Sequence, residues 1–376
     1  MAPAVQVERP RAGQDCRSRS RRRTAPKDVP HFAWQEGMRL GPGDRYVAQR
    51  LLGDGTFGRV LLCRDEQAGG EVAIKVIKDD PYLRHQAEAE AEVLRELAKQ
   101  APRCRRLCVQ LHETFIHSRR HMCLVFEALG GNLSSFLKAN KNLGLYLEDV
   151  KAISKQLLEC VALLHAASVI HTDLKTKNVL LRHADVVTLP HPRVADAQAF
   201  RLVSPEIVVV DFGSALYEEE CNAGIVCTRQ FRPPEVVLGM LWDKKVDLWS
   251  VACITATLYQ GHRPFNVHED MEHLAMMEHF VGAKLPLKMC ASLMQSGLPE
   301  GVKLNAVGAL EWLGPAASEE AVARVQQVVP LRKMVEVRHK AFFHMLKRLF
   351  ALDPARRFGA GDTLKEPFFT EPLPAE

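Results

Sequence analysis

The chain has no continuous apolar run that approaches the length of about 18 residues with which a helix crosses a bilayer. Its first residues lack the apolar core of a secretory signal. The ten cysteines show no paired CxxC spacing, and Cys104 with Cys108, the nearest approach to a metal-binding pattern, lacks a second pair. We therefore expect a soluble intracellular protein that contacts no membrane, keeps its thiols reduced and holds no structural metal.

Most of the chain also lacks an excess of charge of either sign. The net charge is +5, and residues 1–30 alone carry eight Arg or Lys against three Asp or Glu, so the remainder is neutral. A nucleic-acid-binding domain would carry the basic excess itself, so we expect no direct nucleic-acid binding by the folded part. We interpret residues 1–33 as a basic disordered tail. Its Arg-rich run at 17–23, with Ser18 and Ser20, fits a nuclear-import signal, a short arginine-serine segment or a solubilising tail.

The residue pattern predicts two lobes of different architecture. Residues 46–62 combine strand-forming residues with glycines, and 71–77 is another strand-like run. Residues 85–97 are rich in Ala, Glu and Leu without Gly or Pro, which favours a helix. Within 150–164, apolar residues recur at three- and four-residue steps, typical of a helix that faces a core. We predict an α+β protein in which a small β-rich lobe with one helix precedes a larger, mainly helical lobe.

Polar side chains in the middle of the chain are suited to phosphoryl transfer. Asp173 lies in the run HTDLK, Asn178 follows it, and Asp211 begins the run DFG. Asp173 can accept a proton from a substrate hydroxyl, while Asn178 and Asp211 offer the hard oxygen ligands that Mg²⁺ prefers. Lys175, two residues beyond Asp173, can neutralise a phosphoryl group in transfer. The runs together predict the base, metal ligands and a cation of one site.

A glycine-rich run, GDGTFGRV, lies upstream. Gly53, Gly55 and Gly58 stand where a backbone must approach phosphates closely and adopt dihedral angles that a side chain would penalise. A dinucleotide-binding loop would lead into a helix, with an acidic residue about 20 positions further on. Here a strand follows instead and ends in the run VAIK at Lys75. We expect the ammonium of Lys75 to hold the α- and β-phosphates of a nucleotide.

The ammonium of Lys75 requires a carboxylate partner. Glu90, on the predicted helix, is the best candidate. Glu88 and Glu92 compete with it, but we expect them to be solvated, because only one position of this helix faces the lysine.

A run that changes from apolar to polar, LVFEAL at 124–129, precedes two glycines and predicts a hinge between the lobes. Adenine requires an apolar slot with backbone hydrogen bonds at its edge. We place Phe126 at the back of this slot and backbone groups from Glu127 to Leu129 at the adenine edge. Apolar residues from both lobes are expected to form the walls, or otherwise only to pack in the core: Leu52, Val60, Ala73, Leu180 and Val210.

These runs, in this order, resemble the set that identifies protein kinases. The run EHLAMMEH at 272–279 resembles the EHLAMMER signature of the LAMMER, or Cdc-like, kinases, with His279 in place of the final Arg. The runs HTD, LEW at 310–312 and DPARR at 353–357 support this resemblance, which extends from about residue 34 to residue 369.

The resemblance implies roles for residues near the end of the activation segment, where this chain has the run TRQFRPPE. Thr228, its first residue, would hydrogen-bond the catalytic aspartate and the neighbouring lysine. Glu235 and Arg357 match the buried ion pair that anchors this segment in kinases. Asp247 matches the helix carboxylate that supports the catalytic loop.

By resemblance the chain contains a kinase domain at 46–369, with lobes at 46–127 and 130–369 and inserts near 183–206 and 283–332. Family members phosphorylate Ser and Thr, and sometimes Tyr, with ATP and Mg²⁺, and act on arginine-serine-rich splicing factors in the nucleus. We expect the same activity and cofactors, basic protein substrates, and a monomer located in the nucleus and also in the cytoplasm.

Thr176 and Lys177 depart from the family, whose members usually have Pro-Glu there. A glutamate would attract a basic substrate, whereas Lys177 would repel it. The acidic run at 218–220 would compensate for this repulsion, or else is only a solvated face. The arginine-rich preference therefore follows less directly from the resemblance than kinase activity does.

The sequence has two rival interpretations. A pseudokinase scaffold would lack one of the residues that hold the nucleotide or carry the chemistry, and all four are present: Lys75, Asp173, Asn178 and Asp211. A LAMMER-like kinase that acts in cell-cycle or chromosome-segregation control would carry the same motifs, so the sequence does not separate it from a splicing kinase.

Overall fold

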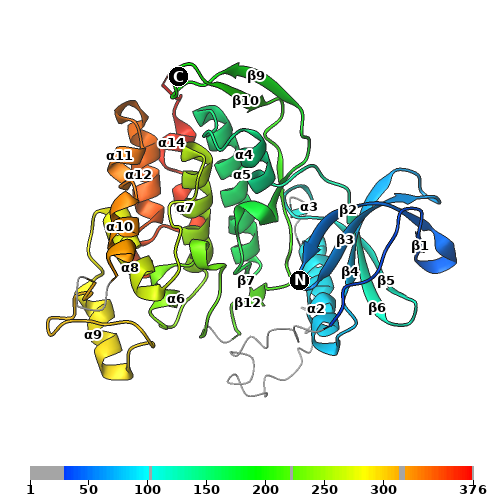
Figure 1. Cartoon of the computed structure of the whole chain (residues 1–376), viewed down its shortest axis with the longest axis horizontal. Helices are drawn as coiled ribbons and strands as arrows, with labels where there is room; N and C mark the ends of the chain where they lie inside the picture. The colour runs from blue at the N-terminus through cyan, green and yellow to red at the C-terminus, as the bar shows by residue number, and fades with distance from the viewer. Residues whose placement is uncertain (1–28, 101–103, 221–222, 313–317, 375–376) are drawn as a thin grey trace, which may run out of the picture.

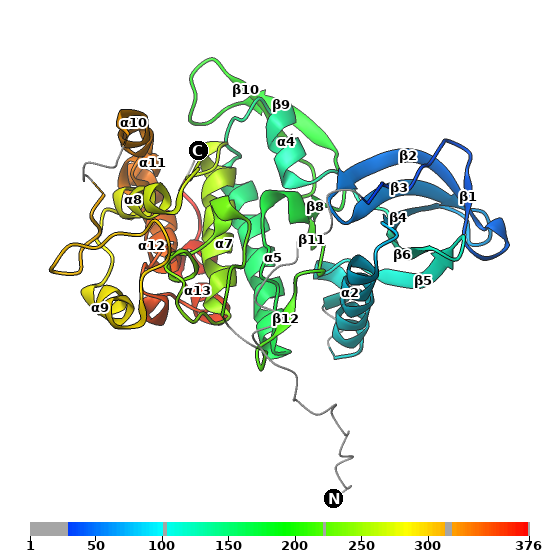
Figure 2. The ribbon, with the colours of Figure 1, turned by 60° about the horizontal axis from the view of Figure 1, so that its bottom comes forward.

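The computed structural model describes residues 29–100, 104–220, 223–312 and 318–374, which form two lobes (Figure 1). The smaller lobe contains an antiparallel six-stranded sheet in the order β1-β2-β3-β4-β6-β5. Helix α2 packs against β4, β5 and β6, as Figure 2 shows. The elements of this lobe are β1 (Arg39–Leu40), β2 (Tyr46–Gly55), β3 (Gly58–Asp65), β4 (Glu71–Ile77), α2 (Pro81–Gln100), α3 (Cys104–Leu107), β5 (Leu111–His117) and β6 (His121–Glu127).

Alternation along β4 determines which side chains face the cleft between the lobes. Ile74 and Val76 are buried in the core on one face of the sheet, so Ala73 and Lys75 lie on the opposite face, the face that α2 covers. Helix α2 begins before the predicted range 85–97 because Asp80 caps it: its Oδ1 accepts the N–H of Leu83 at 2.9 Å.

The larger lobe is mainly helical, with α5 packed against α7 at its centre. The predicted apolar stripe of α5 is confirmed, because each of its five residues is fully buried: Val150, Ile153, Leu157, Val161 and Leu164. The helices are α4 (Leu133–Ala139), α5 (Leu147–Ala166), α6 (Pro234–Val237), α7 (Lys245–Gln260), α8 (Asp270–Val281), α9 (Leu287–Ser296), α10 (Glu319–Gln327), α11 (Leu331–Met334), α12 (Lys340–Leu349), α13 (Ala360–Thr363) and α14 (Pro367–Thr370).

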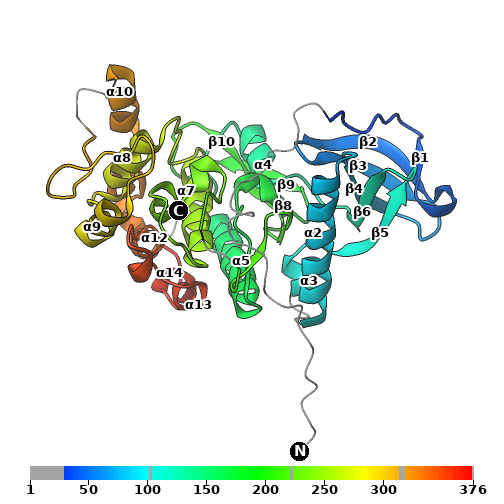
Figure 3. The same cartoon turned by 90° about the horizontal axis from the view of Figure 1, so that it is seen from below.

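Three antiparallel strand pairs complete this lobe. The pair β9–β10 forms a hairpin within residues 183–206 and lies near α4 in Figures 1 and 2. Figure 3 shows α8, α9 and α10 at the end of the molecule opposite the sheet. The strands are β7 (Val169–Ile170), β8 (Val179–Leu181), β9 (Val186–Pro190), β10 (Gln198–Leu202), β11 (Ile207–Val209) and β12 (Leu216–Tyr217), paired as β7–β12, β8–β11 and β9–β10.

The predicted disordered tail, residues 1–33, needs one correction. Residues 1–28 lie outside the described residues, but Phe32 is buried in the core of the small lobe. Residues 30–33 therefore belong to the folded domain. Among the described residues, no helix is both long enough and apolar enough to cross a membrane.

Candidate active site

Three charged side chains from three different elements meet in the cleft. The Nζ of Lys75 in β4 lies 2.8 Å from Oε2 of Glu90 in α2 and 3.1 Å from Oδ1 of Asp211. The structure thus places Glu90 against the lysine, whereas Glu88 pairs with Arg84 on the exposed side of α2. Helix α2 is therefore oriented so that Glu90 faces the cleft and pairs with Lys75.

The titration of this cluster follows from burial and mutual charge. Burial opposes the charge of Lys75, but Asp211 and Glu90 outweigh that effect and raise the pKa of the ammonium. Lys75 lowers the pKa of Asp211, whereas burial raises the pKa of Glu90. The site therefore presents a fixed cation beside an ionised aspartate.

The pair β8–β11 brings Asn178 and Asp211 to one end of the site. Val179 pairs with Val209, and the N–H of Val210 donates to the carbonyl of Asn178 at 3.0 Å. Asn178 donates Nδ2 to the carbonyl of Asp173 at 3.0 Å, which leaves its Oδ1 without a partner among the described residues. One oxygen of Asp211 is likewise left without a hydrogen bond within these residues. An amide oxygen and a carboxylate oxygen fit a hard divalent cation.

Asp173 is held by the residues predicted to surround it. Its Oδ2 lies 2.7 Å from Nζ of Lys175, and its Oδ1 accepts the hydroxyl of Thr228 at 2.7 Å and the N–H of Thr228 at 3.1 Å. The Nζ of Lys175 also donates to the hydroxyl of Thr228 at 3.2 Å. The carboxylate is therefore fixed by Lys175 of the same loop and by Thr228, which lies 55 positions further along the chain.

Asp247, buried in α7, supports the loop that carries Asp173. Its carboxylate accepts the N–H groups of His171 and Thr172, both at 3.0 Å, and lies 3.0 Å from Nε2 of His165. Thr172 has a φ of +63°, which a β-branched residue rarely adopts. The two hydrogen bonds to Asp247 compensate for this strain. The contact with His165 had no signal in the sequence, because the residues are 82 positions apart.

Of the three predicted loop glycines, Gly58 is required by the fold itself. A Cβ there would collide with the carbonyl oxygen of Val76 on the neighbouring strand. A Cβ at Gly53 would meet nothing within 4 Å, and one at Gly55 only the carbonyl of Gly58, at 3.7 Å. Gly53 and Gly55 therefore leave open space, which is what close approach of a phosphate requires.

The residues predicted to line the adenine slot come from the small-lobe sheet, the hinge that follows β6 and the larger lobe. Phe126 is buried and pairs with Ala73 across β4 and β6, while Ala73, Leu129 and Val210 are half-buried against the same core. The N–H of Glu127 donates to the carbonyl of Gln110 at 3.3 Å.

The hinge backbone keeps groups for a ligand at Leu129, whose N–H and carbonyl have no hydrogen-bond partner within the described residues. Val60 and Leu180 are also half-buried, in β3 and β8, whereas Leu52 is exposed near the loop.

Sequence reasoning missed a contact at the hinge. The guanidinium of Arg182 donates to Oε2 of Glu127 at 2.9 Å and to the carbonyl of Arg106 at 3.0 Å. Glu127 and Arg182 are 55 positions apart, and Arg182 lies in no motif that would pair it with the hinge. This contact ties the hinge to the strand that leads into the β9–β10 hairpin.

Beneath the cleft, Glu235 and Arg357 form a bidentate ion pair, with distances of 2.6 and 2.9 Å. Both side chains are fully buried, and the guanidinium also lies over the ring of Trp249 at 5.2 Å. The segment after Thr228 is therefore anchored to the helical lobe.

The two glutamates of the EHLAMMEH run bind residues of the insert at 283–332, which follows the run in the sequence. Glu272, in α8, binds Arg324 of α10 at 2.5 and 3.3 Å. Glu278 accepts the N–H of Leu285 at 2.8 Å and the ammonium of Lys284 at 2.7 Å. The predicted apolar role of the same run is also observed, because Leu274 and Met277 are fully buried.

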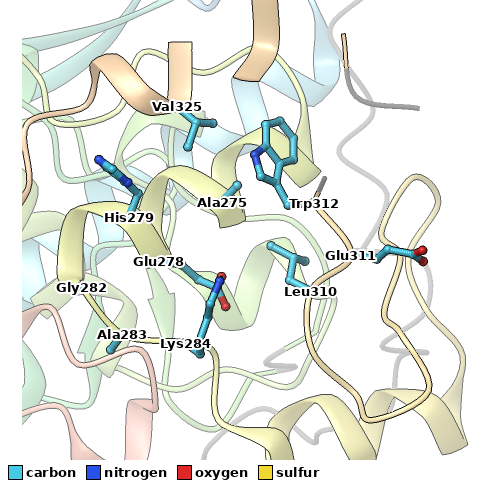
Figure 4. Close-up of a pocket in the computed structure, with 10 residues that line it drawn as sticks. All are labelled: Ala275, Glu278, His279, Gly282, Ala283, Lys284, Leu310, Glu311, Trp312 and Val325. Carbon is cyan, nitrogen blue, oxygen red and sulfur yellow. The ribbon is translucent and has the colours of Figure 1, made fainter. Parts of the chain in front are cut away.

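A pocket of about 660 Å³ lies beside this helix and outside the cleft (Figure 4). The side chains of Ala275, Leu310, Trp312 and Val325 surround it, and Glu278 lies at its edge. It contains none of the residues predicted to bind the nucleotide.

Comparison with known proteins agrees with this geometry. The protein kinase domain family matches residues 46–369. Serine/threonine-protein kinase AFC2 of Arabidopsis thaliana is 37% identical over 348 residues, which cover 90% of this chain and 79% of the relative. Dual specificity protein kinase CLK1 of Homo sapiens is 34% identical over 356 residues, which cover 93% of this chain and 71% of the relative.

A solved kinase domain has the same fold, with a TM-score of 0.82 and 33% identity, covering 90% of this chain and 98% of that one. The predicted two-lobed α+β architecture is therefore confirmed. The chain belongs to the protein kinase family and, within it, to the LAMMER, or Cdc-like, kinases, enzymes that transfer a phosphoryl group to Ser and Thr residues of proteins.

Proposed function

We propose that this kinase uses ATP with Mg²⁺ to phosphorylate basic, arginine-serine-rich proteins in the nucleus, mainly on Ser and Thr and sometimes on Tyr. The dual-specificity relatives and the basic first 30 residues support this proposal. The enzyme acts as a monomer that is also present in the cytoplasm. Its folded domain does not bind nucleic acid directly, since the basic excess lies in residues 1–30.

The contact of Lys75 with both Glu90 and Asp211 carries the argument for a working enzyme rather than a scaffold. In this arrangement the ammonium is fixed where phosphate oxygens approach. Asp211 and Asn178 would hold Mg²⁺, which when bound neutralises charge on the nucleotide phosphates.

Asp173 accepts the proton of the substrate hydroxyl, because its carboxylate faces the cleft and is oriented by Thr228. Lys175 lies beside it and stabilises negative charge on the transferred group.

The charge of the peptide substrate affects its binding near Lys177. This residue is exposed in the turn Thr176–Asn178, directly after the catalytic loop. A cation at this place disfavours an arginine-rich peptide by about 1 kcal/mol. Compensation by the acidic run is limited, since Glu218 already pairs with Lys244 at 3.1 Å. The proposed preference for basic peptides is therefore moderate and open to improvement by one substitution.

A peptide assay with the purified chain tests this proposal. Wild-type enzyme should phosphorylate arginine-serine peptides more efficiently than neutral ones, and Lys177→Glu should lower the KM for the basic peptides several-fold with little change for neutral ones. Neutralising residues 218–220 together should raise that KM.

Added salt should reduce both effects, because exposed charges are screened beyond about 8 Å at physiological ionic strength. Lys303→Glu, at an exposed lysine of the insert, is the matched control and should change neither KM. If the ratio of basic to neutral peptide turnover is the same in all variants, peptide charge is read elsewhere and the proposal is wrong.

A further inference from the structure

A short segment ahead of the kinase domain is attached to the small lobe. It precedes the residues 46–369 that match the kinase family. Phe32 is only 7% exposed and packs edge-on against His117 and His121, with ring centroids 5.5 and 5.0 Å apart. Trp34 packs against the same core. The segment is therefore fixed to the β5–β6 hairpin.

The same segment contacts the glycine loop through Asp54, which stands between Gly53 and Gly55. The guanidinium of Arg59 donates two hydrogen bonds to Oδ2 of Asp54, at 3.0 and 3.1 Å. The Nδ1 of His31 lies 3.0 Å from the other carboxylate oxygen. Arg59 also donates to the carbonyl of Phe32 at 2.8 Å. One guanidinium thus links the loop to the attached segment.

The register of the sheet shows why this link controls the loop. Asp54 and Arg59 are cross-strand partners in β2 and β3, next to the pair Gly55 and Gly58 that closes the turn. Glycine gives such a turn little stiffness of its own. The contacts of Arg59 and His31 therefore restrain the part of the loop that must lie over a nucleotide.

The charge of Asp54 gives the link a second consequence. A carboxylate beside the loop glycines repels the phosphates of a nucleotide unless it is neutralised and turned away from them. Arg59 donates to one of its oxygens, and the ring of His31 lies against the other, with Nδ1 3.0 Å away. Loss of Arg59 would leave more negative charge near the phosphate position, and loss of either side chain would leave a looser loop.

We propose that His31, Phe32 and Arg59 are positioning residues, which hold Asp54 outward and the glycine loop in its nucleotide-binding position, so that residues ahead of the kinase domain set the affinity for ATP. The proposal rests on ATP being the phosphoryl donor. It extends the nucleotide site to His31 and Phe32, which lie outside the glycine-rich run.

Steady-state kinetics of the purified full-length chain with a generic peptide test this proposal. His31→Ala and Arg59→Gln should each raise the KM for ATP about two- to five-fold, the range that loss of an exposed ion pair gives. The kcat at saturating ATP and the KM for the peptide should stay within about two-fold, since neither residue touches the peptide or the reacting atoms. Phe32→Ala should act in the same direction.

A double variant of His31 and Asp54 distinguishes a positioning role of His31 from a general loss of folding or stability. In an Asp54→Asn background, His31→Ala should have no further effect on the KM for ATP, because the carboxylate that it contacts is gone. Arg64→Ala is the matched control: it breaks the exposed pair of Arg64 with Glu66 on the same strand and should leave the KM for ATP unchanged.

Two results would overturn the proposal. The first is an unchanged KM for ATP in both His31→Ala and Arg59→Gln while the wild-type enzyme is active. The second is an effect of His31→Ala that persists in the Asp54→Asn background. An inactive wild-type enzyme would instead contradict the proposed kinase function, so the two failures are distinguishable.

Discussion

The ion cluster in the cleft and the ion pair beneath it both join a cation to carboxylate groups, but they differ in how many of their polar atoms have hydrogen-bond partners. Arg357 uses all its donors: it binds Glu235 twice, the carbonyl of Ala351 twice and the carbonyl of Lys245 once. Asp211, by contrast, is about one-third exposed and gives one oxygen to Lys75. A saturated ion pair, in which every polar atom has a partner, stabilises the fold. An unsaturated one leaves polar atoms without partners, and these atoms can bind a ligand.

The largest expected effect breaks the chemistry of the cleft without disturbing the fold. Asp173→Asn should lower kcat by about 10²- to 10⁴-fold, because an amide cannot accept the substrate proton. Nucleotide affinity and Tm should stay near the wild-type values, since Asp173 does not contact the adenine slot. Kinase assays, nucleotide titration and thermal unfolding measure the three quantities.

Asp211→Asn sharpens the same point. It should abolish phosphotransfer and also weaken nucleotide binding in the presence of divalent metal, because a metal ligand and a partner of Lys75 are lost together. Wild-type turnover in either aspartate variant would contradict these assignments.

The next effect breaks the saturated pair instead. Arg357→Ala should lower the free energy of unfolding by about 3–5 kcal/mol, since it leaves Glu235 charged and without its partner in the core. Urea unfolding checks this value. Arg356→Ala, at the exposed neighbour that lies 4.0 Å from Asp353, is the control and should change stability by less than about 0.5 kcal/mol. Equal losses in the two variants would show that the buried pair has no special role.

The residues of the cleft could be predicted because each lies in a short sequence motif whose residue types indicate its chemical role. Glu90 could be chosen among three glutamates because a helix directs one position toward the lysine. The Ala-, Glu- and Leu-rich pattern predicts too late a start for α2, because it excludes Pro81, which is compatible with a first helical turn.

Contacts between distant segments that belong to no motif pair were not predictable from the sequence. Arg182 with Glu127, and Arg59 with the carbonyl of Phe32, join residues 55 and 27 positions apart. Each contact depends on how the sheet, the hinge and the first residues pack, and a local pattern carries no information about that packing.

A smaller effect tests a buried histidine of the larger lobe. His273, in α8, is fully buried, and neither ring nitrogen has a hydrogen-bond partner within the described residues. Burial, with a contribution from Arg232 and Arg229, lowers its pKa to about 3. The unfolded chain takes up the proton at about pH 6.5 and the folded one does not, so stability falls as pH decreases below that value.

The expected loss for His273 is about 2 kcal/mol between pH 7 and pH 5. His273→Leu should remove this part of the pH dependence, measured as the free energy of unfolding at the two pH values. His279→Ala, at the exposed histidine of the same helix, should keep it. An unchanged pH dependence in His273→Leu would mean that the buried ring does not titrate in this way.

The smallest expected effect concerns Thr172, the residue directly before the catalytic Asp173. Kinases with an arginine at this place usually need a phosphate on the activation segment to neutralise the buried cation. Thr172 carries no charge; its hydroxyl donates to the carbonyl of Ser214 at 2.6 Å, and its carbonyl accepts the N–H of Cys227 at 2.9 Å. The activation segment is thus held at both sides of the loop by neutral hydrogen bonds, which are satisfied without a phosphate.

Phosphatase-treated enzyme should therefore keep activity within about two-fold of untreated enzyme, whereas Thr172→Arg should lower activity because it buries an uncompensated cation. A large loss after phosphatase treatment that rephosphorylation restores would show that a phosphate, and not Thr172, orders this segment.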